Sequence, residues 1–243
     1  MFDKLTQYKG SASESSWENL FLGYDVEQKV ELMQKSRLFY LLFKYLKKED
    51  KIMEAGCGMG KLSLALLDAG FDMIGIDYSE KLINKIQLAR PQLKNHFICM
   101  DARKFDFSKE VFDAVISPGV IEHFHEPEQA VMLKEIYRVL KPNGRLLCIV
   151  PFMNWIKVLK APLIQKAYNK KRDSGVGFYQ YVYSVGALRK LLSMRGFNIE
   201  KVELLGLHDT RLFGKKIIPV WLQNNSFLLR LFGTTMIAMC KKK

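Results

Sequence analysis

The sequence predicts an α/β fold in which helices cover both faces of a doubly wound, mostly parallel sheet. Short strands that are apolar at nearly every position alternate with segments whose apolar residues recur at helical spacing. Three glycines at positions 56, 58 and 60 follow the first strand, and Asp77 closes the second. Strands without a polar side must be buried on both faces, and the alternation supplies a helix after each strand.

Residues 26–150 are predicted to form the core of this fold. Its first element is an amphipathic helix over residues 26–46. Gly70 ends the helix that begins near residue 61, as a C-terminal glycine does, and Ser79 caps the next helix, which ends before Pro91. The remaining elements are a helix over 128–140, with a turn at 142–144, and strands over 51–54, 73–77, 96–100, 112–117 and 145–150.

The regular alternation lapses after Pro151. Residues 151–183 mix basic and aromatic side chains and are predicted to form a helical cap inserted after the fifth strand. Residues 184–243 complete a sheet of seven strands, with a helix over 184–194, strands near 198–205 and 235–240, and an apolar insertion near 217–232. Residues 1–25 are polar and Ser-rich, and are predicted to be a flexible segment that folds over a cofactor cleft as a lid.

Composition is consistent with a cytoplasmic globular protein. Apolar residues make up 49% of the chain, yet no uninterrupted apolar run is long enough to span a membrane. The N-terminus lacks the basic and apolar regions of a secretory signal. The four cysteines are scattered and have no metal-ligand spacing, so reduced thiols and no metal site are expected.

Charge is distributed very unevenly along the chain. Residues 151–243 contain 17 Lys and Arg against 4 Asp and Glu, which accounts for the whole net charge of +13. Such an excess indicates an anionic substrate, surface or partner. Ordinary solubilising charge, including the three lysines at the C-terminus, is the alternative explanation.

The glycine triplet and Asp77 predict a site for a nucleoside-type cofactor. Glycine is needed where the backbone turns sharply and touches a ligand, and an acid at the next strand end can accept hydrogen bonds from ribose hydroxyls. The spacing is not the G-x-G-x-x-G of dinucleotide-binding proteins, because Lys61 occupies the position of the third glycine. A phosphate-binding P-loop motif is also absent from the sequence.

At this point the chain resembles the class I S-adenosylmethionine-dependent methyltransferases. The first motif, residues 54–60, reads Glu-Ala-Gly-Cys-Gly-Met-Gly. The resemblance continues in the family's order, over about residues 35–150, through Asp77, residues 100–102, the strand 112–117, residues 122–124 and residues 139–144. It implies the Rossmann-like methyltransferase fold with an antiparallel edge, and S-adenosyl-L-methionine as cofactor.

The resemblance also implies which residues bind the cofactor. Asp77 would accept both ribose hydroxyls, although an acid preceding Ser79 is also favourable as a helix N-terminal charge. Asp101 would accept the adenine amine, unless it is an ordinary loop acid. Glu54 would lie beside the methionine moiety. The full expected set is Glu54, Gly56, Cys57, Gly58, Gly60, Asp77, Tyr78, Asp101, Ala102 and Ser117.

His123 is the candidate catalytic base. It follows the fourth strand closely enough to face the cleft, and its pKa suits proton abstraction near neutral pH. The run Glu122-His123-Phe124 also resembles a recurrent sequence in relatives with unrelated acceptors, so a structural role is the alternative.

We expect a methyltransferase acting on a small-molecule or lipid-like acceptor. An RNA methyltransferase using the basic C-terminal region, or a non-catalytic cofactor-binding protein, remains an alternative. Ser117-Pro118-Gly119-Val120 replaces the Asn/Asp-Pro-Pro-Tyr motif of enzymes that methylate base amines, which makes nucleic acid less favoured. The basic, aromatic C-terminal segments fit peripheral contact with an anionic surface at the inner membrane, or a groove for a partner subunit.

Overall fold

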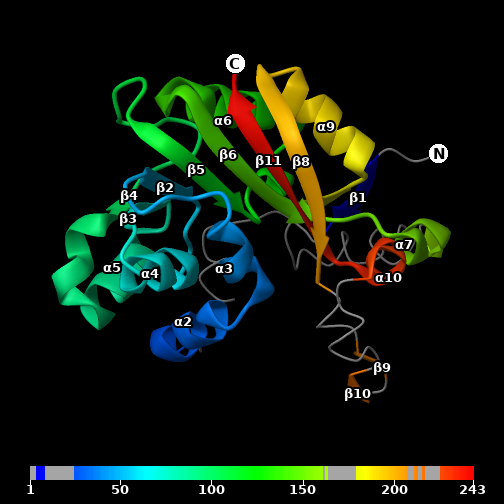
Figure 1. The fold of residues 1–243 in the computed structure, drawn as a ribbon, viewed down its shortest axis with the longest axis horizontal. Helices are drawn as coiled ribbons and strands as arrows, with labels where there is room; N and C mark the ends of the chain where they lie inside the picture. The colour runs from blue at the N-terminus through cyan, green and yellow to red at the C-terminus, as the bar shows by residue number, and fades with distance from the viewer. Residues whose placement is uncertain are drawn as a thin grey trace.

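The computed structural model centres on one seven-stranded sheet (Figure 1). The structure describes residues 4–8, 25–160, 162–163, 179–206, 211–212, 215–216 and 225–243. The strand order is β4-β3-β2-β5-β6-β11-β8. The strands are β2 (Lys51–Ala55), β3 (Asp72–Asp77), β4 (Phe97–Cys99), β5 (Phe112–Pro118), β6 (Leu140–Pro151), β8 (Phe197–Leu205) and β11 (Thr235–Lys242).

Strand pairing confirms the predicted mostly parallel sheet with an antiparallel edge. The pairs β2–β3, β2–β5, β3–β4 and β5–β6 are parallel, whereas β11 runs antiparallel to both β6 and β8. Parallel strands expose their carboxyl ends on one side of the sheet. The loops that follow β2, β3, β4, β5 and β6 therefore gather along one edge.

Helices cover both faces of the sheet, as the continuous apolar strands predict (Figure 1). Side chains alternate along a strand, so Ala114 and Ile116 enter one hydrophobic cluster and Val115 enters the other. The helices α2 (Val26–Gln34), α3 (Arg37–Leu42), α4 (Lys61–Asp68) and α5 (Glu80–Ala89) pack in the first cluster. The helices α6 (Glu126–Val139) and α9 (Val185–Ser193) pack in the second.

The single helix predicted over residues 26–46 is wrong. The structure has two helices, α2 and α3, separated at Lys35 and Ser36. Ser36 has an extended backbone, and its hydroxyl accepts a hydrogen bond from the Phe39 N–H at 3.1 Å. A serine in this position satisfies a helix N-terminus better than it continues a helix interior, which explains the break.

Strand β6 begins five residues before the predicted start at residue 145. The predicted turn at residues 142–144 lies within it as an irregularity. Phe112 pairs with Leu140, but Ala114 already pairs with Arg145, so four residues of β6 fall between these pairs. Asn143 in this segment has a φ of 64°, which interrupts the regular ladder.

The N-terminal segment and the cap differ from the prediction where the structure describes them. Within residues 1–25, the strand β1 (Lys4–Tyr8) pairs antiparallel with β7 (Tyr179–Tyr183) at the end of the cap. In the cap, α7 (Trp155–Leu159) is a helix of 5 residues. The predicted lid over 9–24, the cap over 164–178 and the apolar insertion over 217–224 lie outside the described residues. No helix in the described ranges is long and apolar enough to cross a bilayer.

Short elements complete the described chain. The 3₁₀ helix η1 (Pro91–His96) leads into β4, and a second one, η2 (Ile121–His123), follows β5. The two-residue strands β9 (Arg211–Leu212) and β10 (Lys215–Lys216) pair with each other, and α10 (Ser226–Phe232) precedes β11.

Candidate functional site

The glycine loop between β2 and α4 is fixed against the end of β3. The backbone N–H groups of Gly56 and Cys57 both donate to the carbonyl of Ile76, at 2.8 Å each. The N–H of Gly58 donates to Asp77 Oδ2, also at 2.8 Å. The two predicted elements of the cofactor site, the glycine triplet and the acid, are thus brought together by direct contact.

Backbone conformation explains why glycines occupy this loop. Gly56, Gly58 and Gly60 have φ values of 78°, 55° and 69°, in the left-handed region that favours glycine. At Gly56 a Cβ atom would also lie 2.4 Å from Cγ2 of Val120, in the loop after β5. The glycines therefore hold a turn that passes close to two other strand ends.

Asp77 is buried and oriented by the backbone. Its two carboxylate oxygens accept N–H groups from Gly58 and from Ser79, the latter at 3.0 Å. Burial raises the pKa of this carboxyl, while these backbone hydrogen bonds act in the opposite direction. A carboxylate has about four acceptor positions. The predicted role as acceptor for two ribose hydroxyls therefore fits the positions that the backbone leaves open.

Glu54, at the end of β2, is a second buried acid beside the loop. The hydroxyl of Ser63 on α4 donates to its Oε2. Burial raises the pKa of Glu54 to about 7, and the nearby Asp77 carboxylate adds to this effect. Among the described residues no Lys, Arg or His forms an ion pair with Glu54 or Asp77. The charge of Lys61 lowers the pKa of Glu54 only in part, so the two buried carboxylates remain suited to a cationic ligand.

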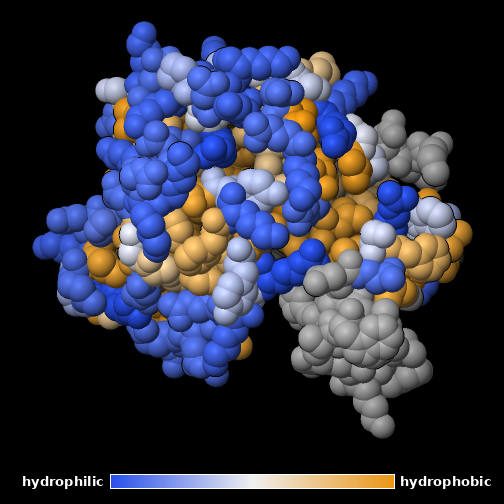
Figure 2. All heavy atoms as spheres, viewed as in Figure 1, coloured by the Kyte–Doolittle hydropathy of each residue, from blue (hydrophilic) through white to orange (hydrophobic). Residues whose placement is uncertain are grey.

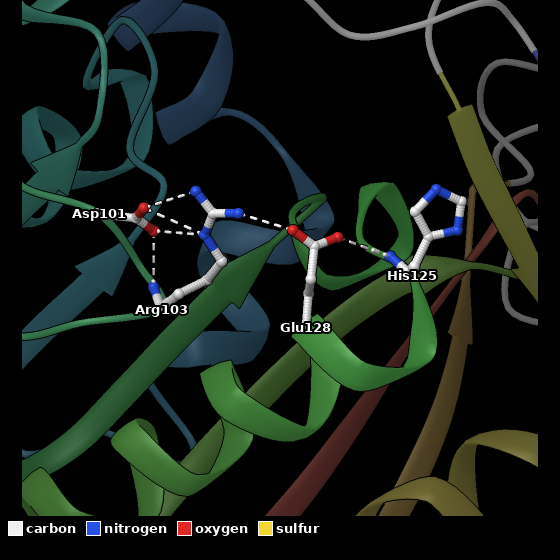
Figure 3. A network of polar contacts seen from close by, with 4 residues as sticks. All are labelled: Asp101, Arg103, His125 and Glu128. Carbon is white, nitrogen blue, oxygen red and sulfur yellow. Dashed lines mark hydrogen bonds and ion pairs between the residues drawn. The ribbon is translucent and has the colours of Figure 1, made fainter.

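Asp101 lies in the loop after β4 and takes part in a network of polar contacts (Figure 3). Arg103 donates to both oxygens of Asp101 and, through Nη1, to Glu128 at 2.6 Å. The other Glu128 oxygen accepts the backbone N–H of His125. The Arg103 guanidinium lowers the pKa of Asp101. The predicted contact of Asp101 with adenine stays a prediction, because Arg103 already uses much of its acceptor capacity.

The other predicted cofactor-binding residues lie along the same edge. Tyr78 directly follows Asp77 and is exposed, whereas Ala102, which directly follows Asp101, is buried. Cys57 is buried in the glycine loop, and burial raises the pKa of its thiol well above the usual range, which keeps it neutral. Ser117, near the end of β5, is buried, and no described residue forms a hydrogen bond with its hydroxyl.

His123 is the last residue of η2, which follows β5. In the sheet β2 lies between β5 and β3, so the glycine loop after β2 separates η2 from Asp77 at the end of β3. Its Nε2 lies 4.0 Å from Oε1 of the neighbouring Glu122. Glu122 is almost fully buried, its Oε2 has no hydrogen-bond partner in the described part of the chain, and burial raises its pKa to about 8. Glu122 is therefore largely protonated at neutral pH. The role of His123 as a base stays a prediction.

Two buried polar residues that the sequence analysis did not identify hold this segment in place. Gln129 on α6 donates through Nε2 to the carbonyls of Ile121 and Phe124 and to the Tyr183 hydroxyl at 2.8 Å. The side chains of Gln129 and Tyr183 are almost completely buried. The available sequence signal was a glutamine on the apolar face of an amphipathic helix. Ser63 gives the same kind of signal, because it is a polar residue at a core position of α4.

Comparison with known proteins identifies the core. Residues 52–144 match a family model described as a methyltransferase domain. The fold is similar to that of a solved S-adenosylmethionine-dependent methyltransferase from Methanosarcina mazei, with a TM-score of 0.64 and 22% identity, over 83% of this chain and 96% of that one. The Rossmann-like methyltransferase fold implied by the sequence resemblance is confirmed.

Curated relatives share the core but differ in acceptor. The human eEF1A lysine and N-terminal methyltransferase is 35% identical over 121 residues, which are 45% of this chain and 17% of that protein. The ubiquinone biosynthesis O-methyltransferase of Coxiella burnetii (strain Dugway 5J108-111) is 30% identical over 119 residues, 48% of this chain and 50% of that one. The alignments thus span half or less of the length of these relatives.

The raised pKa of Glu122 makes a prediction for stability. Between about pH 4.5 and 8 the folded protein keeps a proton that the unfolded chain releases, so Glu122 makes the free energy of unfolding fall as pH rises. We expect Glu122→Gln to be more stable than the native protein at pH 7.5, with a gap of up to a few kcal/mol that closes toward pH 4.5. Urea unfolding across this range measures it, with the exposed Glu49→Gln as control. A gap that does not change with pH would contradict the buried, protonated state.

Proposed function

We propose that this chain, whose residues 52–144 match a methyltransferase domain, transfers a methyl group from S-adenosylmethionine to a small-molecule or lipid-like acceptor. The observation that carries the proposal is the pair of buried carboxylates, Glu54 and Asp77, neither of which forms an ion pair with a described Lys, Arg or His; the more distant Lys61 lowers the pKa of Glu54 less than burial raises it. This donor set fits a ligand with positive charge and ribose hydroxyls. The four cysteines are unpaired, which supports a reducing, cytoplasmic setting.

S-adenosylmethionine, when bound, supplies a methyl group that its positively charged sulfur makes electrophilic. The glycines over residues 56–60 allow the sharp left-handed turn beside the site, and the absence of a Cβ at Gly56 and Gly60 leaves room for the packing of Val120 and of Ile86 against the loop. Asp77 would hold the ribose, and Glu54 would balance positive charge near the end of β2. Since methyl transfer needs alignment more than acid–base chemistry, the main contribution of these residues is rigid positioning.

His123 would act only if the acceptor must lose a proton. It ends η2, and Gln129 of α6 holds this segment by donating to the backbone carbonyls of Ile121 and Phe124. A fixed position beside the carboxyl end of β5 supports a base role. The rigidity of the same segment supports the alternative, in which His123 only shapes the site.

The surface near the carboxyl edge favours a small-molecule or lipid-like acceptor. Trp155 and Leu159 on α7, four to eight residues after β6 ends, are exposed. An exposed apolar surface beside this edge supports a lipid-like acceptor, which would reach the site from an apolar phase. An RNA or protein acceptor, or cofactor binding without transfer, remains the alternative. Comparing metabolites of cells with and without the gene, for species that differ by one methyl group, tests the proposal.

We expect Asp77→Asn to weaken the affinity for S-adenosylhomocysteine by at least about a hundredfold. Two hydrogen bonds to an ionised acceptor contribute about 1.5–3 kcal/mol each. Isothermal titration calorimetry measures the change, and thermal unfolding checks that the variant is folded. Asp72→Asn, at the exposed start of the same strand, is the control and should bind normally. Undiminished affinity in Asp77→Asn would remove this residue from the site.

The raised pKa of Glu54 leads to a prediction of how the affinity for the cofactor depends on pH. A cationic ligand prefers the ionised carboxylate, and the pKa of Glu54 is about 7 in the free protein. Affinity for S-adenosylmethionine should therefore rise between pH 5.5 and 7, by up to about tenfold per pH unit. In Glu54→Gln the calorimetric affinity should lose most of this slope. An equally steep slope in the variant would show that another group titrates.

His123→Ala tests the base. If the base role is correct, turnover falls by about a hundredfold or more while cofactor affinity is unchanged. Methyl transfer from labelled cofactor into an organic extract of the producing cells gives the readout. His125→Ala, two residues away and exposed, is the matched control. A loss of thermal stability together with activity would assign His123 a structural role.

A further inference from the structure

Two short helices beside the carboxyl end of β6 present large apolar side chains to solvent. Trp155 and Leu159 on α7 are 57% and 82% exposed, Leu163 just beyond it is 70% exposed, and Phe227 on α10 is 62% exposed. The two helices contact each other, and Figure 2 shows hydrophobic residues gathered over them at the right of the view. We call these four residues the α7–α10 patch.

The helices that carry the patch are anchored to the body of the protein. Asn154 caps α7, with its Oδ1 accepting the N–H of Lys157, and its Nδ2 donates to the carbonyl of Gly233 at the end of α10. Leu229 of α10 is buried on the opposite side from Phe227. Lys157 turns inward and donates to the carbonyl of Phe152. The exposed side chains are thus presented by a fixed frame.

The sequence around the patch contains only positive charge. Residues 151–172 include six Lys and Arg and no Asp or Glu, and no acid occurs from residue 210 to the C-terminus. Among the described residues, Lys160 beside α7 and Arg230 on α10 are exposed. Apolar side chains surrounded by uncompensated cations fit a partner that offers both negative charge and an apolar interior.

We propose that the α7–α10 patch docks the protein on the surface of an anionic lipid membrane. An anionic bilayer offers phosphate groups to Lys160 and Arg230, and hydrocarbon just below them to Trp155, Leu159 and Phe227. A nucleic acid would also match the positive charge of the patch. Proteins bind single-stranded nucleic acid through basic grooves with aromatic side chains that stack on the bases, and exposed leucines have no role in such binding. The structure therefore favours a membrane.

Position in the fold connects this surface to the methyltransferase site. Thr235, which follows α10, pairs with Pro151 at the carboxyl end of β6. The glycine loop and η2 follow the carboxyl ends of β2 and β5 on the same edge of the sheet. A docked protein would hold this edge near the bilayer, where lipid-like molecules are concentrated. Only this link rests on the proposed function; docking is independent of catalysis.

Vesicle sedimentation tests the docking surface with the intact protein. We expect it to sediment at low salt with vesicles of phosphatidylcholine and phosphatidylglycerol, to stay in solution with phosphatidylcholine alone, and to be released by high salt. The variant Leu159→Ser with Phe227→Ser should lose at least about tenfold in membrane partitioning. Leu88→Ser, 81% exposed on α5, removes an equally exposed leucine elsewhere and should bind normally.

Vesicle sedimentation also tests the contribution of the positive charges beside the patch. Lys160→Glu with Arg230→Glu should weaken sedimentation with anionic vesicles, whereas Lys94→Glu with Lys109→Glu, exposed sites on other segments, should have a much smaller effect. Equal sedimentation with neutral and anionic vesicles, or patch variants that bind like the native protein, would overturn the proposal. RNA binding that depends on Lys160 and Arg230 without vesicle binding would overturn it in favour of a nucleic-acid partner.

Calorimetry on the same samples separates this proposal from the proposed function. Patch variants that lose vesicle binding but keep affinity for S-adenosylhomocysteine support docking as a separate property. A protein that sediments with anionic vesicles but neither binds the cofactor nor methylates an acceptor would keep the docking surface and refute the methyltransferase proposal.

Discussion

The predicted cofactor site of this protein depends on two buried carboxylates at the ends of neighbouring parallel strands. Glu54 and Asp77 lie where β2 and β3 end, and Asp77 fixes the glycine loop by accepting the N–H of Gly58. Burial raises the pKa of both, and neither forms an ion pair with a described Lys, Arg or His. Two such groups are costly in an isolated protein, and a cationic ligand would offset that cost, which supports the proposed role of these residues in binding the cofactor.

A second set of buried polar groups holds the segment that follows β5 in place. Gln129 joins η2 to Tyr183 in β7, and β7 pairs with the N-terminal strand β1. The loop after β5, the end of the cap and the start of the chain are thus linked through one amide. Among the described residues, Oε1 of Gln129 and Oε2 of Glu122 are buried and have no hydrogen-bond partner.

Local signals predicted the elements that depend on local chemistry. Ser79 caps α5 and Gly70 has a φ of 82° after α4, as the sequence indicated. The break at Ser36 was missed because the apolar spacing continues across it, although a serine before an apolar run is a start signal in its own right. Pairing of β1 with β7 joins segments far apart in the chain. No local pattern specifies such a pair.

The sequence by itself determined the doubly wound sheet, the glycine loop and the acid that faces it, because strand burial and glycine conformation leave periodic, local marks. Only the tertiary structure decided that Arg103 is paired with Glu128, that Glu122 is buried with a raised pKa, and that the helices carrying the exposed Trp155 and Phe227 contact each other. These properties depend on which distant residues become neighbours. Solvation and charge pairing are set by that three-dimensional neighbourhood, and the linear order of residues does not encode it locally.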